Sequence, residues 1–320
     1  MRIRMLIFLL IIVGIVSQFG CARSHRIPVI YDTDIGGDID DTWALAFLLA
    51  SPELDLKLVV TDSHDAEGKA KIVAKLLERV GRTDVPVGIG LKFDDDIGRQ
   101  AGWVKDYDLD KYPGKVHKDG IQAMIDTIMK SPEPITLIAV GPVPNLPEAL
   151  KREPKIAQRA RLVVMGGSIE FKYGRKKGRC AEYNVRHKPK AAQVAYGADW
   201  DVTMTPLDTA DFVILDGEDY ARVRDADNPL ARALMENYRI WCKGKKWPNP
   251  NKHSSTLFDT VAIYLAFTNE LCEMRDIHLR VDDKGFTIPD PRGKLTHVAM
   301  KWKDLAAFET FLSERIANYK

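Results

Sequence analysis

Apolar residues along this chain follow two patterns. Short runs such as 135–140 are apolar at nearly every position, which is typical of a buried strand. In longer stretches the apolar positions recur every three to four residues, as at Ile72, Leu76 and Val80 within 66–80, and this spacing predicts an amphipathic helix. The predicted strands cover 27–31, 54–61, 85–89, 135–140, 161–165, 201–204, 277–281 and 295–302. The predicted helices cover 41–50, 66–80, 120–129, 188–196, 229–241, 255–267 and 304–317.

This alternation of strands and helices predicts an α/β fold. Strands that are rich in valine, isoleucine and leucine throughout are buried on both faces, as in a parallel sheet covered by helices. We therefore expect a single large domain with a mostly parallel, Rossmann-like open sheet flanked by helices. Ligands of such sheets bind beyond the carboxyl ends of the strands, so polar residues that directly follow a strand are the first candidates for a site.

The amino-terminal segment has the composition of an export signal. Two arginines precede the apolar run 5–16, which is too short to span a bilayer comfortably as a helix. The step from Gly20 to Cys21 resembles a bacterial lipoprotein cleavage site. We expect residues 1–20 to be a signal peptide and residues 21–320 to form the exported domain, in the periplasm or cell envelope, with a lipid on Cys21. An ordinary cleaved signal and a retained anchor remain alternatives.

Composition narrows the function further. The 320 residues include 47 basic and 45 acidic side chains, and a net charge of +2 does not favour a nucleic-acid partner. The 45% hydrophobic and 29% charged content excludes a disordered chain and a multi-span membrane protein. After Cys21, only Cys180, Cys242 and Cys272 remain, without the spacing of a metal site or a disulfide framework. At most one bridge could form, and buried free thiols are the alternative.

An acidic segment follows the first predicted strand. Five aspartates fall within ten residues, with two glycines between them and no basic residue: Asp32, Asp34, Asp38, Asp40 and Asp41. Carboxylates so close together repel and raise one another's pKa unless a cation lies among them. Oxygen-rich clusters on a turn suit Ca²⁺. Helix capping is the alternative, but it accounts only for the aspartates next to the helix, not for those on the strand side.

The segment 32–41 resembles the acidic fingerprint of the inosine–uridine type nucleoside hydrolases, Asp-Thr-Asp-Pro-Gly-x-Asp-Asp. Here Ile35 replaces the proline, and two residues are inserted before the final aspartate pair. Other segments are similar to motifs of the same family, in the same order: Gly81 to Val87, Thr136 to Pro142 with Asn145, Val164 to Gly167, Ala181 to Asn184, and Thr205 to Asp208.

The resemblance implies Ca²⁺-dependent hydrolysis of the N-glycosidic bond of ribonucleosides, or of a related N-riboside, to ribose and free base. It assigns Asp34 as a metal ligand and as the general base on the attacking water. The other implied ligands are Asp41, Asp259 and the backbone carbonyl of Val140. Residues implied to contact the substrate are Asp40, Glu182, Asn184, His64 and Met165.

The chain departs from the family pattern at three positions, one of which is Lys188, where the family commonly has an aspartate before the proline. Phe258 stands where the family often has a histidine that protonates a purine leaving group. The usual Val-Gly-Asn after the second strand is replaced by 61–65, where His64 or Asp65 could take the place of the missing amide. His117 and His64 are therefore the candidate acids, although His117 could equally be a surface residue. The departures leave the base specificity open.

Two rival interpretations follow from the same residues. A non-catalytic lipoprotein that binds sugars or nucleosides would keep the metal site and have lost turnover. A haloacid-dehalogenase-like phosphatase would also place an aspartate pair after the first strand, as at Asp32 and Asp34, but it requires a hydroxyl residue where Gly36 stands. The expected partner is a small ribonucleoside, with no nucleic acid; membrane contact would come through the lipid anchor, and a homo-oligomer is left open.

Overall fold

The computed structural model describes residues 26–320. The predicted signal peptide and Cys21 lie outside the described residues. Within residues 26–320 no helix is both long and apolar enough to cross a bilayer. The three cysteines of this part, Cys180, Cys242 and Cys272, are free thiols, as one of the two alternatives anticipated.

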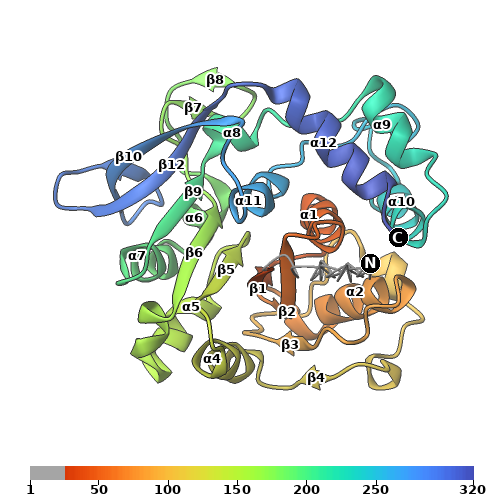
Figure 1. Ribbon diagram of the computed structural model, residues 1–320, viewed down its shortest axis with the longest axis horizontal. Coiled ribbons are helices and arrows are strands. Elements are labelled where there is room, and N and C mark those ends of the chain that lie inside the picture. The colour runs from red at the N-terminus through yellow and green to blue at the C-terminus, as the bar shows by residue number, and fades with distance from the viewer. Residues whose placement is uncertain (1–25) are drawn as a thin grey trace, which may run out of the picture.

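One open sheet of ten strands forms the centre of the described chain (Figure 1). Its strand order is β11-β10-β12-β9-β6-β5-β1-β2-β3-β4. The strands are β1 (Ile27–Thr33), β2 (Leu54–Thr61), β3 (Val87–Ile89), β4 (Val116–His117), β5 (Ile135–Ala139), β6 (Ala160–Met165), β9 (Val202–Thr205), β10 (Cys272–Val281), β11 (Thr287–Pro289) and β12 (Lys294–Trp302). All neighbours from β12 to β4 pair in parallel, and only β10 and β11 add antiparallel pairs at one edge. The predicted fold class is confirmed.

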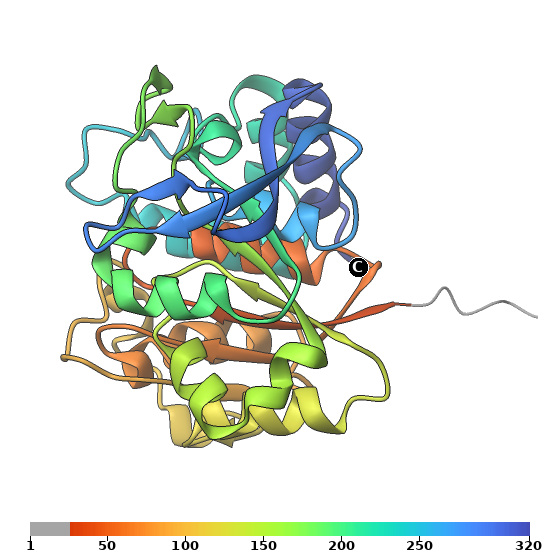
Figure 2. The same ribbon diagram turned by 90° about the vertical axis from the view of Figure 1, so that its left-hand side faces the viewer.

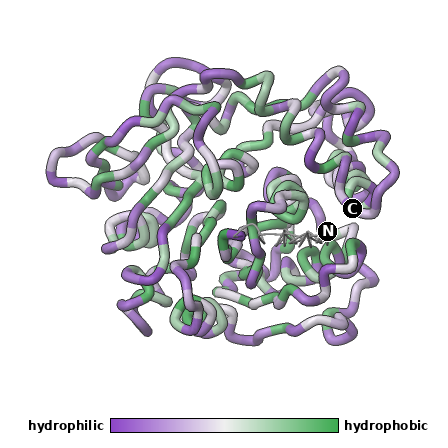
Figure 3. The backbone as a smooth tube through the Cα atoms, in the orientation of Figure 1, coloured by the Kyte–Doolittle hydropathy of each residue, from purple (hydrophilic) through white to green (hydrophobic). Residues whose placement is uncertain are grey.

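Helices cover both faces of the sheet because the strand residues alternate between two apolar cores. Tyr31 and Val59 face one core, whereas Ile30 and Val60 face the other. The first core is covered by α1 (Asp40–Leu49), α2 (Ala66–Arg79), α8 (Leu207–Ala210), α9 (Gly217–Arg224), α10 (Pro229–Trp241), α11 (Thr260–Leu265) and α12 (Leu305–Ala317). The second is covered by α4 (Gly120–Lys130), α5 (Asn145–Arg152) and α7 (Pro189–Gly197). The green apolar segments of Figure 3 accordingly lie inside the molecule.

Smaller elements complete the chain. They are α3 (Ala101–Val104), α6 (Tyr183–His187), the short helices η1 (Leu109–Lys111) and η2 (Pro154–Gln158), and a separate hairpin of β7 (Phe171–Lys172) and β8 (Lys176–Lys177). Figure 2 shows that the carboxyl terminus lies on the same side of the molecule as the start of β1. The hairpin projects from the opposite side, at the upper left of that view.

The helix predicted over 255–267 is wrong in its first five residues. Backbone and side-chain hydrogen bonds tie Ser254 to Leu215, and the Leu257 amide donates to the Val213 carbonyl, so this stretch runs extended along another loop. The helix α11 begins only at Thr260, which makes Asp259 its N-cap. This late start determines where the Asp259 carboxylate lies.

The order of the strands changes direction between β1 and β5. The chain runs outward from β1 through β2 and β3 to β4, and then returns to β5 on the other side of β1. In open α/β sheets such a switch point leaves a crevice beyond the carboxyl ends of the two strands, because their connections leave in opposite directions. Asp34 and Val140 directly follow β1 and β5 and therefore flank this crevice.

Candidate active site

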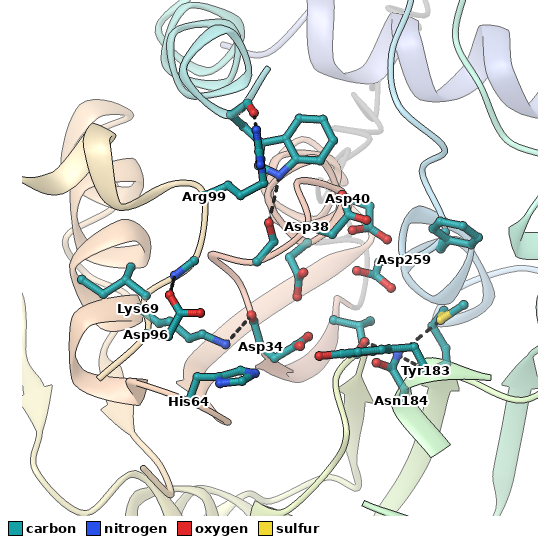
Figure 4. Close-up of a pocket in the computed structure, with 18 of the residues that line it drawn as sticks. Asp34, Asp38, Asp40, His64, Lys69, Asp96, Arg99, Tyr183, Asn184 and Asp259 are labelled. Carbon is teal, nitrogen blue, oxygen red and sulfur yellow. Dashed lines mark hydrogen bonds between the residues drawn. The ribbon is translucent and has the colours of Figure 1, made fainter. Parts of the chain in front are cut away.

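A cavity of about 480 Å³ lies at this switch point (Figure 4). Residues from the β1–α1 loop, the loop 96–99 and the stretch 182–184 line it, together with residues near the ends of α10 and α11. All but one of the residues expected to bind the metal, contact the substrate or act as the acid line the cavity: Asp34, Asp40, Asp41, His64, Val140, Met165, Glu182, Asn184 and Asp259.

His117 is the exception. It lies on the edge strand β4, beside Gly88 of β3, and does not line the cavity. Burial lowers its pKa. Because β4 is the last strand of the sheet, a side chain there is separated from the switch point by β2 and β3. The structure therefore does not bring His117 together with the other candidate residues.

Three buried carboxylates form the most compact group in the cavity. Asp40 and Asp41 belong to the first turn of α1, and Asp259 caps α11, which packs against α1. One oxygen from each carboxylate lies within 4.8 Å of the other two. We call Asp40, Asp41 and Asp259 the carboxylate cluster. It contains Asp40 in addition to the two predicted ligands, whereas Asp34 lies outside this closest set and also lines the cavity.

The electrostatics of the carboxylate cluster are unfavourable without a cation. Burial raises the pKa of Asp40, Asp41 and Asp259 well above the ordinary value, and repulsion from neighbouring carboxylates, including Asp34 and Asp38, raises it further. Within residues 26–320 no lysine or arginine forms an ion pair with any of them. The Thr33 hydroxyl donates a short hydrogen bond to Asp41, which stabilises one oxygen only.

The loop that carries these aspartates is fixed by its backbone carbonyl groups. The Lys69 ammonium donates to the Asp34 carbonyl at 2.7 Å, and the Trp241 indole donates to the Gly37 carbonyl at 2.9 Å. The Gln100 amide donates to the Asp38 carbonyl at 2.6 Å. The donors thus hold the main chain and leave the aspartate side chains free to face the cavity.

Gly36 is required by the same loop. Its φ of +119° lies in the region that favours glycine, and a Cβ there would meet the Ile97 carbonyl oxygen at 2.2 Å. The loop 96–99 can pack this closely against the acidic loop only because no side chain stands between them.

Lys69 was not identified from the sequence, although a signal was present. It precedes Ile72 and Val73 by three and four residues, so the helical period places it on the apolar face of α2. A lysine on the buried face of a helix needs a polar partner inside the protein. Here its partners are the carbonyls of Asp34 and Asp62.

The opposite wall is built around Glu182 and Asn184. The Glu182 carboxylate accepts hydrogen bonds from the backbone amides of Gly167, Asn184 and Val185. Burial raises its pKa despite these donors. The Asn184 amide nitrogen donates to the Val140 carbonyl at 2.7 Å. The side-chain nitrogen of Asn184 also donates to the Met165 carbonyl. These hydrogen bonds hold Glu182 and Asn184 near the ends of β5 and β6.

Aromatic rings border this wall, and the sequence did not point to two of them. Tyr173, on the β7–β8 hairpin, donates its hydroxyl to Glu182 at 3.1 Å and accepts from the Tyr183 amide. Its ring meets the Phe258 ring edge-on, with the centroids 6.2 Å apart. The hairpin is thereby tied to the cavity. Tyr183 remains about 40% exposed, which leaves an aromatic face available at the rim.

The carboxylate cluster fits a hard divalent cation. It offers several anionic oxygens and no nitrogen or sulfur, and none of the cations that line the cavity, Lys69, Arg99 and Lys245, forms an ion pair with it. Such a donor set is the chemistry of Ca²⁺ rather than of zinc or copper. The raised carboxyl pKa values agree with this, since they reflect first burial and then negative charge that no bonded cation of the described chain compensates.

Comparison with known proteins agrees with this geometry. Residues 29–310 match the family model described as inosine-uridine preferring nucleoside hydrolase. A pyrimidine-specific ribonucleoside hydrolase RihA from Enterobacter sp. (strain 638) is 28% identical, with 92% of this chain and 98% of that protein covered. The corresponding RihA of Photobacterium profundum is 27% identical, with 91% and 99% covered.

Solved structures share the fold at lower identity. The plant nucleoside hydrolase PpNRh1 superposes with a TM-score of 0.76 and 21% identity, over 92% of this chain and 99% of that one. A purine-preferring ribonucleoside hydrolase from Gardnerella vaginalis gives 0.75 and 23%, over 91% and 98%. The phosphatase interpretation of Asp32 and Asp34 is therefore wrong. Because the family model spans nearly all of the described chain, this protein belongs to the inosine-uridine preferring nucleoside hydrolase family and is an N-glycosyl hydrolase.

Proposed function

We propose that the protein cleaves the N-glycosidic bond of ribonucleosides with one Ca²⁺ bound in the cavity, releasing ribose and a free base. One observation carries this proposal. The carboxylate cluster and Asp34 line one side of the cavity, and Glu182 and Asn184 line the other. A ribose between these walls would find anionic acceptors for its hydroxyl groups and carboxylates near its anomeric carbon.

The ligands that we propose for the metal are Asp34, Asp41, Asp259 and the Val140 carbonyl. Asp40, as a member of the carboxylate cluster, adds a fourth carboxylate to the site. When bound, Ca²⁺ would lower the pKa of a water ligand and orient the ribose diol. The Val140 carbonyl already accepts one hydrogen bond from Asn184, which leaves it one further lone pair.

The residues of the chain supply the rest of the chemistry. Asp34 follows β1 with its carbonyl fixed by Lys69, so its carboxylate is held at the cavity, where it can accept a proton from the attacking water. Cleavage of a glycosidic bond passes through a sugar with oxocarbenium character. The aspartate carboxylates stabilise that positive charge as it develops. They need not rearrange, because hydrogen bonds already fix the main chain of the loop between β1 and α1.

The substrate is a neutral nucleoside, and its base would lie toward the aromatic rim formed by Tyr173, Tyr183 and Phe258. The RihA relatives are named pyrimidine-specific, so uridine and cytidine are the first substrates to assay, with inosine beside them. The test is release of reducing sugar from each nucleoside, with Ca²⁺ and with a chelator. We expect activity only with the metal and none in Asp34→Asn.

Two results would count against this function. Release of ribose that continues unchanged in chelator would exclude the metal-dependent mechanism. A protein that binds nucleosides in a calcium-dependent manner but releases no ribose would instead fit the non-catalytic alternative.

We also propose that the protein is exported and held at the membrane by a lipid on Cys21. The support is the sequence alone: an apolar run preceded by two arginines and followed by Gly20 and Cys21.

A further inference from the structure

The cavity is lined by a histidine, the side chain that most often serves as a general acid. A nucleobase departs with the electron pair of the broken bond and leaves faster when a proton reaches it. Phe258 lines the cavity but has no proton to give. Among residues 26–320, His64 is the only histidine that lines this cavity.

An acidic partner fixes the ring of His64. Its Nδ1 lies 2.8 Å from Oδ2 of Asp94. The other oxygen of Asp94 accepts a hydrogen bond from the backbone amide of Asp96 at 2.9 Å, which orients the carboxylate. These contacts together hold the pKa of Asp94 below its usual range, so it remains an anion beside the imidazole. With Nδ1 engaged, Nε2 is the ring nitrogen available to a substrate.

The main chain at His64 adopts a backbone conformation of high energy. Ser63 and His64 have φ values of 58° and 50°, in the left-handed region that residues other than glycine rarely adopt. Such conformations cost about 1–3 kcal/mol each and persist where surrounding contacts enforce them. Here the amides of Phe93 and Asp94 both donate to the His64 carbonyl, so the loop that supplies the acidic partner also fixes the backbone.

Ring contacts complete the setting. The His64 ring lies 5.5 Å from that of His187, which in turn stacks on Tyr183 at 5.3 Å. Burial and the neighbouring Lys188 lower the pKa of His187, and His187 does not line the cavity. Figure 4 shows His64 and Tyr183 in the lower part of the view, with the Asp34 side chain between them. The base of a bound nucleoside would meet this wall.

We propose that His64, oriented by Asp94, is the acid that protonates the departing base in this protein. This inference rests on the proposed function. The bond between the anomeric carbon and the base nitrogen breaks, and its electron pair stays with the base. The proton on Nε2 of His64 passes to the base. Water forms the new bond to the anomeric carbon and gives its proton to Asp34; exchange with solvent then restores both groups, so one water is consumed for each nucleoside.

The test compares substrates that differ in their need for a proton. Uridine and inosine release poor leaving groups, whereas p-nitrophenyl riboside releases a stable phenolate. For His64→Gln we expect kcat/KM on the nucleosides to fall by about 10²–10⁴, the usual contribution of a general acid. On p-nitrophenyl riboside we expect a change of less than about fivefold, because the acid is not needed there.

The role of Asp94 is one of positioning. Asp94→Asn keeps the size of the side chain but loses the charge, and we expect roughly a tenfold loss on uridine with no loss on p-nitrophenyl riboside. The matched control is His297→Gln, because His297 forms a similar pair with Asp276 at 2.6 Å but lies outside the cavity. This control should leave both rates unchanged.

The outcomes separate the two proposals. If the unaltered enzyme cleaves neither kind of substrate, the proposed function fails, and this inference fails with it. If it cleaves both and His64→Gln slows both by the same factor, His64 serves binding or the water, and its assignment as the acid is overturned. Unchanged rates on uridine in His64→Gln would overturn it as well.

Discussion

Replacing Asp259 by asparagine should change the stability of the protein in opposite directions with and without metal. Asp259 is buried, and one of its oxygens lies within 4.8 Å of oxygens from Asp40 and Asp41. Two unit charges at that distance repel by about 3 kcal/mol at an effective dielectric constant of 20. Because burial raises the pKa of all three carboxyl groups, protonation relieves part of this repulsion before folding is lost.

We therefore expect Asp259→Asn to stabilise the metal-free protein by about 1–3 kcal/mol near pH 8. For a domain of this size, that corresponds to a rise in Tm of about 2–6 °C. In Ca²⁺ the effect should reverse, since the variant has lost one anionic ligand. Its affinity for the ion should fall roughly 100-fold or more, and the rise in Tm on adding Ca²⁺ should shrink accordingly.

The assay is thermal unfolding in a chelator and at increasing Ca²⁺ concentrations, with calorimetric titration of the ion into the folded protein. Asp199→Asn is the control, because this carboxylate is 94% exposed and should show neither effect. A lower Tm for Asp259→Asn in chelator, together with unaltered Ca²⁺ binding, would refute the reasoning. It would mean that Asp259 stabilises the fold through its cap position and holds no metal.

Four further predictions follow from the site. Asp41→Ala should weaken Ca²⁺ binding and turnover far more than Asp38→Ala, because only Asp41 belongs to the carboxylate cluster; equal losses in titration and kinetics would move the role to Asp38. In chelator the free energy of unfolding should fall as pH rises above about 4. The reason is that the folded state, with its raised carboxyl pKa values, binds more protons than the unfolded chain. Denaturant titrations at several pH values should show this slope, and saturating Ca²⁺ should reduce it. Gly36→Ala should lower Tm and kcat together, since its Cβ would meet the Ile97 carbonyl at 2.2 Å, whereas Gly37→Ala meets nothing within 4 Å and should be mild. Cys21→Ser should move the protein from the membrane fraction to the soluble fraction on cell fractionation, and an unchanged distribution would exclude the lipid anchor.

Local pattern was sufficient to predict eight of the ten strands of the sheet and its longer helices, but not the short edge strands β4 and β11 or the helices α5, α8 and α9. The spacing of apolar residues within a short segment indicates a buried strand or an amphipathic helix, as in 54–61 and 66–80. The type of such an element can therefore be predicted without knowing what it packs against. The prediction over 255–267 failed because the first part of that stretch bonds to the distant segment 213–215. No local pattern records such a partner.

The candidate site shows the same division. The acidic residues after β1 and the resemblance in 181–184 were visible in the sequence, because a site at strand ends concentrates unusual residues within short segments. Lys69 could have been found from helical phase. The contact of Tyr173 with Glu182 could not, since it depends on how the β7–β8 hairpin folds back.

The sequence by itself determined the class of fold, the order of its elements and the family chemistry of an acidic turn, because each of these is encoded by periodicity or by a short motif. The tertiary structure alone decided which carboxylates meet. It brings Asp259 to Asp40 and Asp41 through the packing of α11 on α1, leaves His117 on an outer strand, and places His64 in the cavity with Asp94 against its ring. The physical reason is that charge repulsion, metal binding and proton transfer act through distances of a few ångströms, and packing between remote segments sets those distances.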